Sequence, residues 1–369
     1  MTEKTRNRNK IIGWLLVFCF VILLSGCAEQ GKPVSEQPET LAGQVKAEKN
    51  LLAMDTIITL SVYGETEEAA QAALASAETT IHELEQTFST VMADSEVAAI
   101  NRAGGQPVAV SEDVISVLQT ALTVNQETDG AFAMTIYPLV QSWGFMTGDY
   151  RVPEQAEIDQ LLQKVDDREV QLQDEQVQIG AGQEIDLGGV AKGYIAQKII
   201  DQWRQQGITS AMLSLGGNVQ LLGGKPDGTP WQMAVADPLD ASRVFAVLQL
   251  EDVAAVTSGG YQRYFEKDGK TYHHILDPEN GYPAENGLIS VTVIMEDGAK
   301  ADALSTALFV LGPEQAIAYW RAHPDIDLIL VTEDQQVYLT PGLRDGFVAA
   351  DETGGYTYEW LSETKETES

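Results

Sequence analysis

Cysteine and histidine are both scarce in this chain of 369 residues. The two cysteines, Cys19 and Cys27, lie close to the N-terminus, so the rest of the chain holds no disulfide, no cysteine nucleophile and no thiolate ligand for zinc. The four histidines are His82, His273, His274 and His323. A cluster of cysteine and histidine ligands is therefore excluded, and any bound cation should be a hard one with oxygen ligands.

Basic residues are few as well. The chain has 23 Lys and Arg against 55 Asp and Glu, which gives a formal net charge of −32. Nucleic acid is therefore an unfavourable partner, because its affinity for proteins comes mainly from basic side chains that neutralise phosphates. An anionic ligand would need a local source of positive charge, such as Lys192 or a divalent metal. The hydrophobic content of 44% is sufficient for a core.

The N-terminal apolar run, Ile11–Leu24, is shorter than the roughly 20 residues that a membrane-spanning helix needs. Basic residues precede it, and Leu24-Ser25-Gly26-Cys27 closes it in the manner of a bacterial lipobox. We expect residues 1–26 to be a signal peptide and Cys27 to be the acylated anchor. The protein would then lie on the extracytoplasmic face of the cell membrane. A plain transmembrane segment with a coincidental cysteine is the alternative.

The chain after the signal peptide divides into three parts. Residues 27–50 are polar and aperiodic, which predicts a flexible spacer, with order beginning near Leu51. Residues 51–361 contain no second stretch of linker composition, so we expect one domain. Residues 362–369 form an acidic tail.

Hydrophobic periodicity predicts an α+β domain with mixed or antiparallel sheets and flanking helices. Residues 56–63 alternate, with Ile58, Leu60 and Val62 on one face of a strand. Helices are predicted over 65–88, 111–126, 190–206, 301–311 and 314–321. Further strands are predicted over 170–172, 177–179, 211–215, 232–236, 245–250, 261–265, 289–295 and 327–331. Short turns join many of the strands, which favours antiparallel pairing.

The segment from Asp186 to Tyr194 is the most informative motif. It places a carboxylate, the adjacent glycines Gly188 and Gly189, and Lys192 at a predicted helix start. Glycines let the backbone approach a phosphate closely, while free N–H groups and the helix dipole add positive character. The motif therefore indicates a site for an anion such as a nucleotide phosphate. A tight strand-to-helix turn without any ligand explains the same pattern.

Two other positions could contribute to chemistry. Asp302 and Thr306 are four residues apart, so they share one face of an otherwise apolar predicted helix. A carboxylate in such surroundings needs a partner, and Mg²⁺ takes hard oxygen ligands of this kind. The alternatives are an Asp that interacts with the helix dipole and a Thr that bonds to its own turn.

His274 lies at the end of a predicted strand and could exchange a proton near neutral pH. His273 would point to the opposite face, so at most one of the two should lie in a site. A structural histidine bonded to a turn carbonyl is the alternative for His274. The aromatic loop of Ala131, Phe132 and Ala133 could stack on a flat heterocycle, although a core position explains it equally well.

In order along the chain, these segments resemble the ApbE family, flavin transferases that move FMN from FAD to a protein threonine. The resemblance starts at Met54-Asp55-Thr56 and covers most of the chain after the spacer. Its other motifs are Ser95-Glu96, Asn101, Gly130–Thr135, Trp143-Gly144-Phe145, Asp186–Tyr194, Leu215-Gly216-Gly217-Asn218, Thr257-Ser258-Gly259, His274–Pro278 and Ala301–Ala307.

The resemblance implies a single domain that binds FAD in a cleft, with Mg²⁺ on the pyrophosphate. Asp302, Thr306 and the carbonyl of Gly189 match the family's metal ligands, and His274 matches its catalytic histidine. The positions that match flavin-nucleotide contacts are Met54, Ala131, Phe132, Ala133, Asp186, Lys192 and Leu276. The acceptor threonine would attack phosphorus and AMP would leave. The partners would be flavoprotein subunits of membrane or extracytoplasmic redox systems.

The chain departs from the family pattern at four positions. Ala133-Met134 stands where Asp-Pro is common, Gly260 stands where Asp is common, and Val91 stands where an aromatic is frequent. Two carboxylates and a stacking surface are thereby missing. Two other functions therefore stay open, an FAD pyrophosphatase that gives FMN and AMP, and a non-catalytic flavin-binding lipoprotein.

Overall fold

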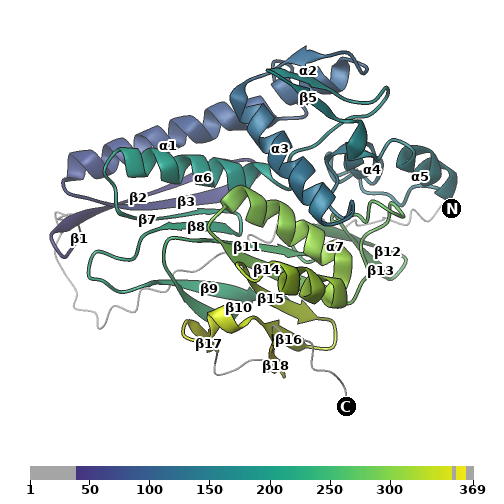
Figure 1. Cartoon of the computed structure of the whole chain (residues 1–369). Coiled ribbons are helices and arrows are strands. Elements are labelled where there is room, and N and C mark those ends of the chain that lie inside the picture. The colour runs from purple at the N-terminus through teal and green to yellow at the C-terminus, as the bar shows by residue number, and fades with distance from the viewer. Residues whose placement is uncertain (1–38, 351–354, 363–369) are drawn as a thin grey trace, which may run out of the picture.

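A ten-stranded sheet forms the centre of the molecule (Figure 1), for which a computed structural model describes residues 39–350 and 355–362. In spatial order its strands are β1 (Thr40–Leu41), β2 (Gln44–Ala53), β3 (Thr56–Gly64), β7 (Ser210–Leu215), β8 (Asn218–Leu222), β11 (Ala254–Gly259), β14 (Leu288–Met295), β15 (Asp327–Thr332), β16 (Gln336–Leu339) and β18 (Thr357–Trp360). Neighbouring strands are antiparallel, except that β16 and β18 are parallel. Because the sheet joins strands from both ends of the described chain, the architecture is one interdependent α+β unit.

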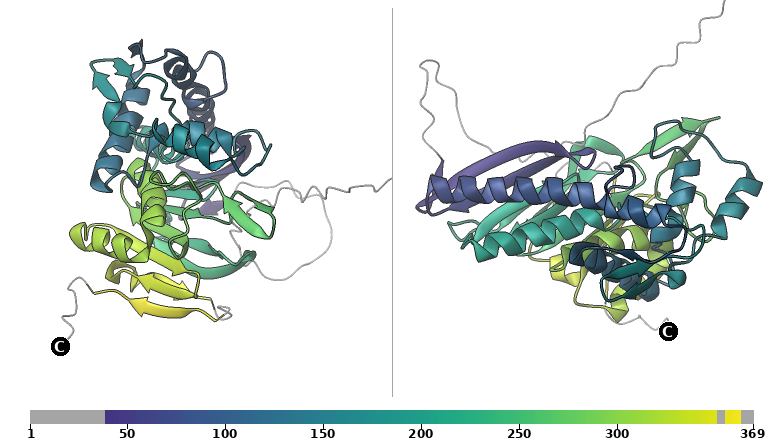
Figure 2. Two further views of the ribbon diagram at one scale, coloured as in Figure 1. Left: turned by 90° about the vertical axis from the view of Figure 1, so that its right-hand side faces the viewer. Right: turned by 90° about the horizontal axis from the view of Figure 1, so that it is seen from above.

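Helices cover one face of this sheet. They are α1 (Glu67–Phe88), α6 (Ala191–Gln205) and α7 (Gly298–Ala322), with α3 (Glu112–Glu127) packed on α7. Seen from above, α1 and α6 run side by side (Figure 2). The predicted alternation of β3 is confirmed, since Ile58, Leu60 and Val62 are fully buried beneath this layer. The apolar strand residues are thus what holds the helices in place.

The second face of the sheet is covered in its middle by three further strands. These are β9 (Trp231–Asp237), β10 (Asp240–Leu250) and β17 (Phe347–Ala349), which pair antiparallel as β17-β10-β9. Side chains such as Val219 and Leu221 from β8 pack against Trp231 and Phe245 in a second core. Strand β8 is therefore buried on both faces, which fixes its position between the two cores.

A satellite cluster lies beside the main core. It contains the hairpin of β12 (Tyr264–Lys267) and β13 (Lys270–His273) with α4 (Tyr137–Ser142) and α5 (Gln155–Leu162). Trp143 is fully buried there, and its indole Nε1–H donates to the carbonyl of Gly281. The remaining elements are α2 (Glu96–Arg102) and a small sheet of β4 (Val108–Ala109), β5 (Gln171–Gln173) and β6 (Gln176–Gln178).

The structure corrects several predicted boundaries. Residues 40–50 were expected in a flexible spacer, yet β1 and most of β2 lie there. The strand expected over 261–265 begins at Tyr264, after the turn that follows Gly259. The predicted break between helices at 311 and 314 is confirmed as a kink at Gly312, which has φ 79°. Helix α7 starts earlier than expected because the Asp297 side chain caps it by accepting from the N–H of Lys300.

Cys27 and the signal peptide lie outside the described residues, as does the tail from residue 363 onward. In the part of the chain that the structure describes, no helix combines enough length and apolar character to span a membrane.

Candidate active site

The N-terminal turns of α6 and α7 approach each other through glycines. A Cβ atom added to Gly193 would lie 2.0 Å from the carbonyl oxygen of Gly298 and 2.8 Å from Cβ of Asp302. Neither the helix backbone nor Asp302 could tolerate that contact, so Gly193 is required for the close crossing. The lysine-glycine part of the predicted phosphate motif therefore has a packing role as well.

Asp302 is the buried carboxylate of this crossing. It is 4% exposed, and its Oδ2 accepts from the backbone N–H of Gly193 at 2.9 Å. That N–H is one of the free donors at the start of α6, so the carboxylate benefits from the dipole of a neighbouring helix. Asp302 has no ion-pair partner among residues 39–350 and 355–362. One hydrogen bond is little compensation for a buried charge, so the site favours an added cation.

Thr306 and Gly189 lie next to each other near this carboxylate. The Thr306 hydroxyl is 3.4 Å from the Ser258 hydroxyl, and a Cβ on Gly189 would be 3.8 Å from Thr306 Oγ1. It is the neighbouring Ser305 whose hydroxyl bonds back to its own turn, to the carbonyl of Asp302 at 2.8 Å. The Thr306 hydroxyl therefore keeps lone pairs that can face a ligand.

The three predicted ligands thus come from two distant segments and supply only oxygen atoms, which suits Mg²⁺. In the described residues no group of three or more His, Cys, Asp and Glu side chains is arranged to hold a metal. The predicted set contains one such residue, Asp302, and depends on a hydroxyl and a carbonyl for the rest. Magnesium sites often use one or two carboxylates and complete their coordination with water and substrate phosphates. The residues present fit that type of site.

Asn218 adds an unsatisfied polar group beneath α6. It is 1% exposed, and neither its amide oxygen nor its amide nitrogen has a hydrogen-bond partner among the described residues. Its strand neighbour Val256 lies on the same face of the sheet as Ser258, which contacts Thr306. A buried amide without a partner is costly, so this part of the protein is complementary to a polar ligand or water.

Asp186 precedes the glycine turn, and Lys192 lies in the first turn of α6, directly after it. The Asp186 carboxylate accepts backbone hydrogen bonds from Gly188 and Leu187, while Lys192 Nζ donates to the Gly188 carbonyl at 3.2 Å. Burial raises the pKa of Asp186, against the opposing effect of these hydrogen bonds and of the positive charges of Lys192 and Arg263. The turn therefore carries both a cation and a carboxyl group of weakened acidity.

The aromatic loop is fixed directly against this turn. Phe132 is 4% exposed, and its ring would be 2.9 Å from a Cβ on Gly189. Asn125 Nδ2 donates to the Phe132 carbonyl at 2.7 Å, and the Asp186 N–H donates to the Met134 carbonyl at 2.9 Å. Ala131 and Ala133 are half-buried beside it. Phe132 is therefore both a core residue and a neighbour of the predicted metal ligands.

Asp167, which the sequence did not indicate, holds the aromatic loop in place. It is 2% exposed and accepts from the N–H groups of Met134 and Thr135 and, at 2.6 Å, from the Thr135 hydroxyl. Burial raises the pKa of Asp167 above its ordinary value, and the hydrogen bonds offset only part of this effect. A proline at position 134 has no N–H and would lose the hydrogen bond to Asp167. This bond gives a structural reason for Met134 in place of the family's proline.

His274, expected at the end of a strand, lies directly after β13 and is held by Arg263. Its backbone N–H donates to the Arg263 carbonyl at 3.1 Å, and its Nδ1 lies 3.2 Å from the same oxygen. Burial, then the charges of Arg263, His273 and Lys192, lower the pKa of His274 to about 3. The ring is therefore neutral at physiological pH and can accept a proton.

His273 has the structural role that its opposite orientation predicts. Its Nε2 is 3.0 Å from the Ala284 carbonyl, and its ring packs edge-on against Phe309 of α7. A Cβ on Gly260 would lie 2.8 Å from this ring. The family's aspartate at that position would thus require His273 to move, which gives the Gly260 departure a physical reason.

Met54 and Leu276 are placed less directly. Met54 occupies the β2–β3 turn with φ 51°, its N–H donates to Glu85, and it packs against the main core. Leu276 is buried in the satellite cluster, with an isolated bridge to Pro283. None of these described contacts joins Met54 or Leu276 to Asp302. Val91 is 75% exposed in the turn after α1.

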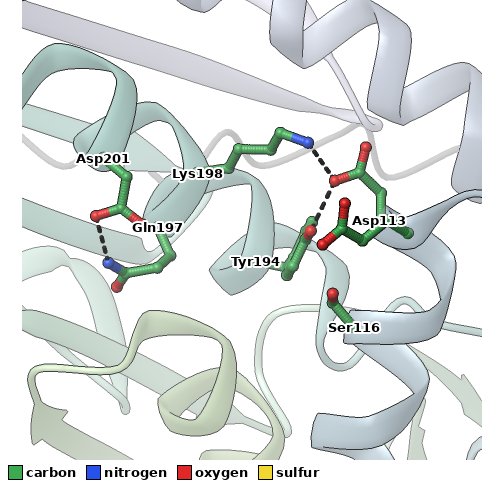
Figure 3. Close-up of a pocket in the computed structure, with 7 residues that line it drawn as sticks. Asp113, Ser116, Tyr194, Gln197, Lys198 and Asp201 are labelled. Atoms are coloured by element: carbon green, nitrogen blue, oxygen red, sulfur yellow. Dashed lines mark hydrogen bonds and ion pairs between the residues drawn. The ribbon is translucent and has the colours of Figure 1, made fainter. Parts of the chain in front are cut away.

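A separate polar groove of about 260 Å³ lies between α3 and α6 (Figure 3). Asp113 dominates it, because it accepts from the Tyr194 hydroxyl at 2.7 Å and pairs with Lys198. No predicted site residue lines this groove. It is therefore not part of the candidate site.

Two solved structures share the fold. The crystal structure of the ApbE protein from Thermotoga maritima is 33% identical, with a TM-score of 0.74, and the match covers 78% of this chain and 95% of that one. The flavin transferase ApbE from Vibrio cholerae is 27% identical, with a TM-score of 0.72 and coverage of 84% and 98%. The α+β architecture is therefore that of the flavin-transferase class.

Sequence comparison gives the family. The ApbE family model matches residues 54–330. An FAD:protein FMN transferase of Klebsiella pneumoniae (strain 342) is 39% identical over 276 residues, which are 73% of this chain and 85% of that protein. Another from Treponema pallidum (strain Nichols) is 33% identical over 314 residues, 80% of this chain and 86% of that protein. The chain belongs to the ApbE family.

Proposed function

We propose that this protein is an FAD:protein FMN transferase that attaches FMN to a threonine hydroxyl of a target flavoprotein and releases AMP. The single observation that carries the proposal is the unpaired, buried carboxylate of Asp302 beside the Thr306 hydroxyl and the Gly189 turn. A buried carboxylate without a cationic partner fits a bound Mg²⁺ ion, through which the diphosphate of a dinucleotide would be held. The names of the two relatives above support this choice of substrate.

Each residue of the candidate site has a separate role in this proposal. Asp302, Thr306 and the Gly189 carbonyl would hold Mg²⁺, which supplies charge stabilisation at the diphosphate. Lys192 would bind phosphate oxygens and hold the diphosphate in place. Phe132 supports Gly189 from below. Phosphoryl transfer depends mainly on such positioning and electrostatics, so little else is required of the protein.

His274 is the base in this proposal. The threonine oxygen forms a bond to the phosphorus on the FMN side while the bond from that phosphorus to the bridging oxygen breaks, and AMP departs with that oxygen. The hydroxyl proton passes to Nε2 of His274. The low pKa of about 3 keeps this nitrogen unprotonated before substrate arrives. An anionic diphosphate in front of the ring counters the charges of Lys192 and Arg263 and raises the basicity of the ring.

The place of action follows from the N-terminal sequence. A signal peptide over 1–26 and acylation at Cys27 would put the domain on the extracytoplasmic face of the cell membrane. The acceptors would then be flavoprotein subunits of membrane or extracytoplasmic redox systems. Mass spectrometry of the membrane-extracted protein tests this directly, since a diacylated N-terminal Cys27 is expected and an intact Met1 would contradict it.

Three incubations separate the candidate functions. The first mixture contains the protein, FAD and Mg²⁺. The second also contains an acceptor domain. The third contains everything in the second together with excess EDTA. We expect AMP and a flavin-labelled acceptor, detected by its added FMN mass, only in the second mixture. AMP and FMN without acceptor would indicate a pyrophosphatase, and bound FAD without AMP in any mixture would indicate a flavin-binding protein.

A further inference from the structure

Arg263 lies in the turn between β11 and β12, outside every motif that sequence analysis singled out. Its main-chain carbonyl accepts from the N–H of His274 at 3.1 Å and lies 3.2 Å from His274 Nδ1. Both contacts join the turn to the end of β13. The position of the His274 ring therefore depends on the backbone of Arg263.

The contact also determines which ring nitrogen carries the proton. A carbonyl oxygen can only accept a hydrogen bond, so Nδ1 of neutral His274 must be the protonated nitrogen in this bond. The lone pair is then on Nε2. A base that acts through Nε2 is thus prepared before any substrate binds.

The guanidinium of Arg263 has no strong hydrogen-bond or ion-pair partner among the described residues. Arg263 is exposed, and the hydrogen bond that its Nη1 donates to the carbonyl of Phe145, within the described part of the chain, is 3.5 Å long. Arg263 takes part in no ion pair in the described part of the chain. Its charge nevertheless lowers the pKa of both Asp186 and His274, as the charge of Lys192 does. The ring of Phe145, whose carbonyl the guanidinium contacts, lies edge-on to the His274 ring with 6.4 Å between the ring centroids, so both ends of Arg263 contact the surroundings of this histidine.

We propose that Arg263 is a substrate-binding residue of this site, whose guanidinium holds oxygens of the phosphate attacked by the acceptor while its carbonyl orients His274. The inference rests on the function proposed above. An arginine suits the task, because its planar fork can donate two parallel hydrogen bonds to phosphate oxygens. In this chain, which has a formal net charge of −32, cationic side chains are few compared with carboxylates. A guanidinium that forms no ion pair is available to bind an anion.

Binding of FAD and riboflavin by Arg263 variants tests the guanidinium. In the presence of Mg²⁺, Arg263→Gln should weaken FAD binding roughly 10- to 100-fold, the range for a charge-assisted hydrogen bond, and leave riboflavin binding unchanged because riboflavin has no phosphate. Arg263→Lys should fall between Arg263→Gln and the wild type. Arg204→Gln, on the far part of α6, is the control and should bind both flavins normally.

Wild-type affinity for FAD in Arg263→Gln would overturn the proposal, and so would an equal loss of FAD and riboflavin, which would indicate a structural role. A wild-type protein that binds no FAD would instead refute the proposed function itself. The two failures are therefore distinguishable by the wild-type titration alone.

The pH dependence of kcat/KM provides a second measurement. The charged groups that face His274 are Arg263, Lys192 of α6 and the neighbouring His273, with Asp186 close to both cations. Removing the charge in Arg263→Gln should move the acidic limb of the profile to higher pH, because one of the charges that disfavour protonation is gone. An acidic limb at the wild-type position would contradict the placement of the guanidinium.

Discussion

The two halves of the candidate site are held in different ways. The α6–α7 half contains Gly189, Gly193, Asp302 and Thr306 and is built into the main core, where backbone meets backbone at the glycines. The hairpin half contains His274, whose neighbours are the carbonyl of Arg263 and the rings of the satellite cluster. The first half lies between two long helices and the central sheet, while the second lies on a two-stranded hairpin.

Because of this difference, we expect the α6–α7 half to bind ligands with a fixed geometry and the hairpin half to change its conformation. A contact between two backbones leaves no side chain that can move aside, so the α6–α7 half has a fixed geometry suited to a metal and a diphosphate. The hairpin half is held by side chains and one carbonyl, so it can shift when substrate or acceptor arrives. We therefore expect substitutions in the α6–α7 half to affect folding and binding together, and substitutions in the hairpin half to affect chemistry with little change in stability.

The largest expected effect is that of Asp302→Ala. Removal of the carboxylate should reduce acceptor labelling about 100- to 1,000-fold, equivalent to about 3 to 4 kcal/mol in the transition state. It should also abolish the rise in Tm that Mg²⁺ gives the wild type, because a ligand stabilises only the state that binds it. Thermal melts with and without Mg²⁺ check the second point, with the exposed Asp201→Ala as the control. A Mg²⁺-dependent rise in Asp302→Ala would place the metal elsewhere.

Gly193→Ala should be the next largest change and should act mainly on stability. The added Cβ would meet the Gly298 carbonyl at 2.0 Å, so the helices must separate, at a cost of about 2 to 3 kcal/mol in the free energy of unfolding. Urea denaturation measures the change. Gln205→Ala, on the exposed end of α6, should stay within about 0.5 kcal/mol of the wild type. A wild-type stability for Gly193→Ala would remove the distinction between the two halves.

The same contrast explains which parts were predictable from sequence. The strand that contains Ile58 and the helix that begins near Gly193 follow from periodicity, and the four-residue spacing of Asp302 and Thr306 puts both on one face. Asp167 has no such signal, because its role depends on the loop that folds over it rather than on its neighbours in sequence.

The boundary of the ordered domain was predicted too late for a similar reason. Strand β2 lies next to the short edge strand β1, and its polar residues form ion pairs, such as Lys46 with Glu48 and Lys49 with Glu78. A polar strand close to the edge of a sheet has the composition of a spacer, since charged side chains near edges prevent unwanted pairing. Tertiary pairing, which the local sequence does not encode, decides its structure.

The pH dependence of stability probes the hairpin half. The pKa of His274 is about 3 in the folded protein, against an ordinary value of 6.5. Between these values the unfolded chain holds a proton that the folded chain lacks, so His274 lowers stability as the pH falls from 6.5 toward 3, by at most about 1.4 kcal/mol per pH unit.

His274→Gln should therefore show a shallower loss of stability than the wild type over this range and the same stability above pH 7. Urea titrations at a series of pH values measure both slopes, and the difference between them isolates His274 from Asp186, whose raised pKa acts in the opposite direction. Parallel slopes would mean that the ring is not buried beside cations.

Gly260→Ala should have the smallest effect and is the closest match to Gly193→Ala. Here the added Cβ would lie 2.8 Å from the ring of His273, a side chain rather than a backbone. The ring can tilt if its bond to the Ala284 carbonyl lengthens, so we expect a loss of about 1 kcal/mol and labelling within about threefold of the wild type. The same added methyl group would thus lower the free energy of unfolding less in the hairpin half than in the α6–α7 half. A loss as large as that of Gly193→Ala would show that the hairpin is as rigid as the helix crossing, and His274 would then have to act from the position it already holds.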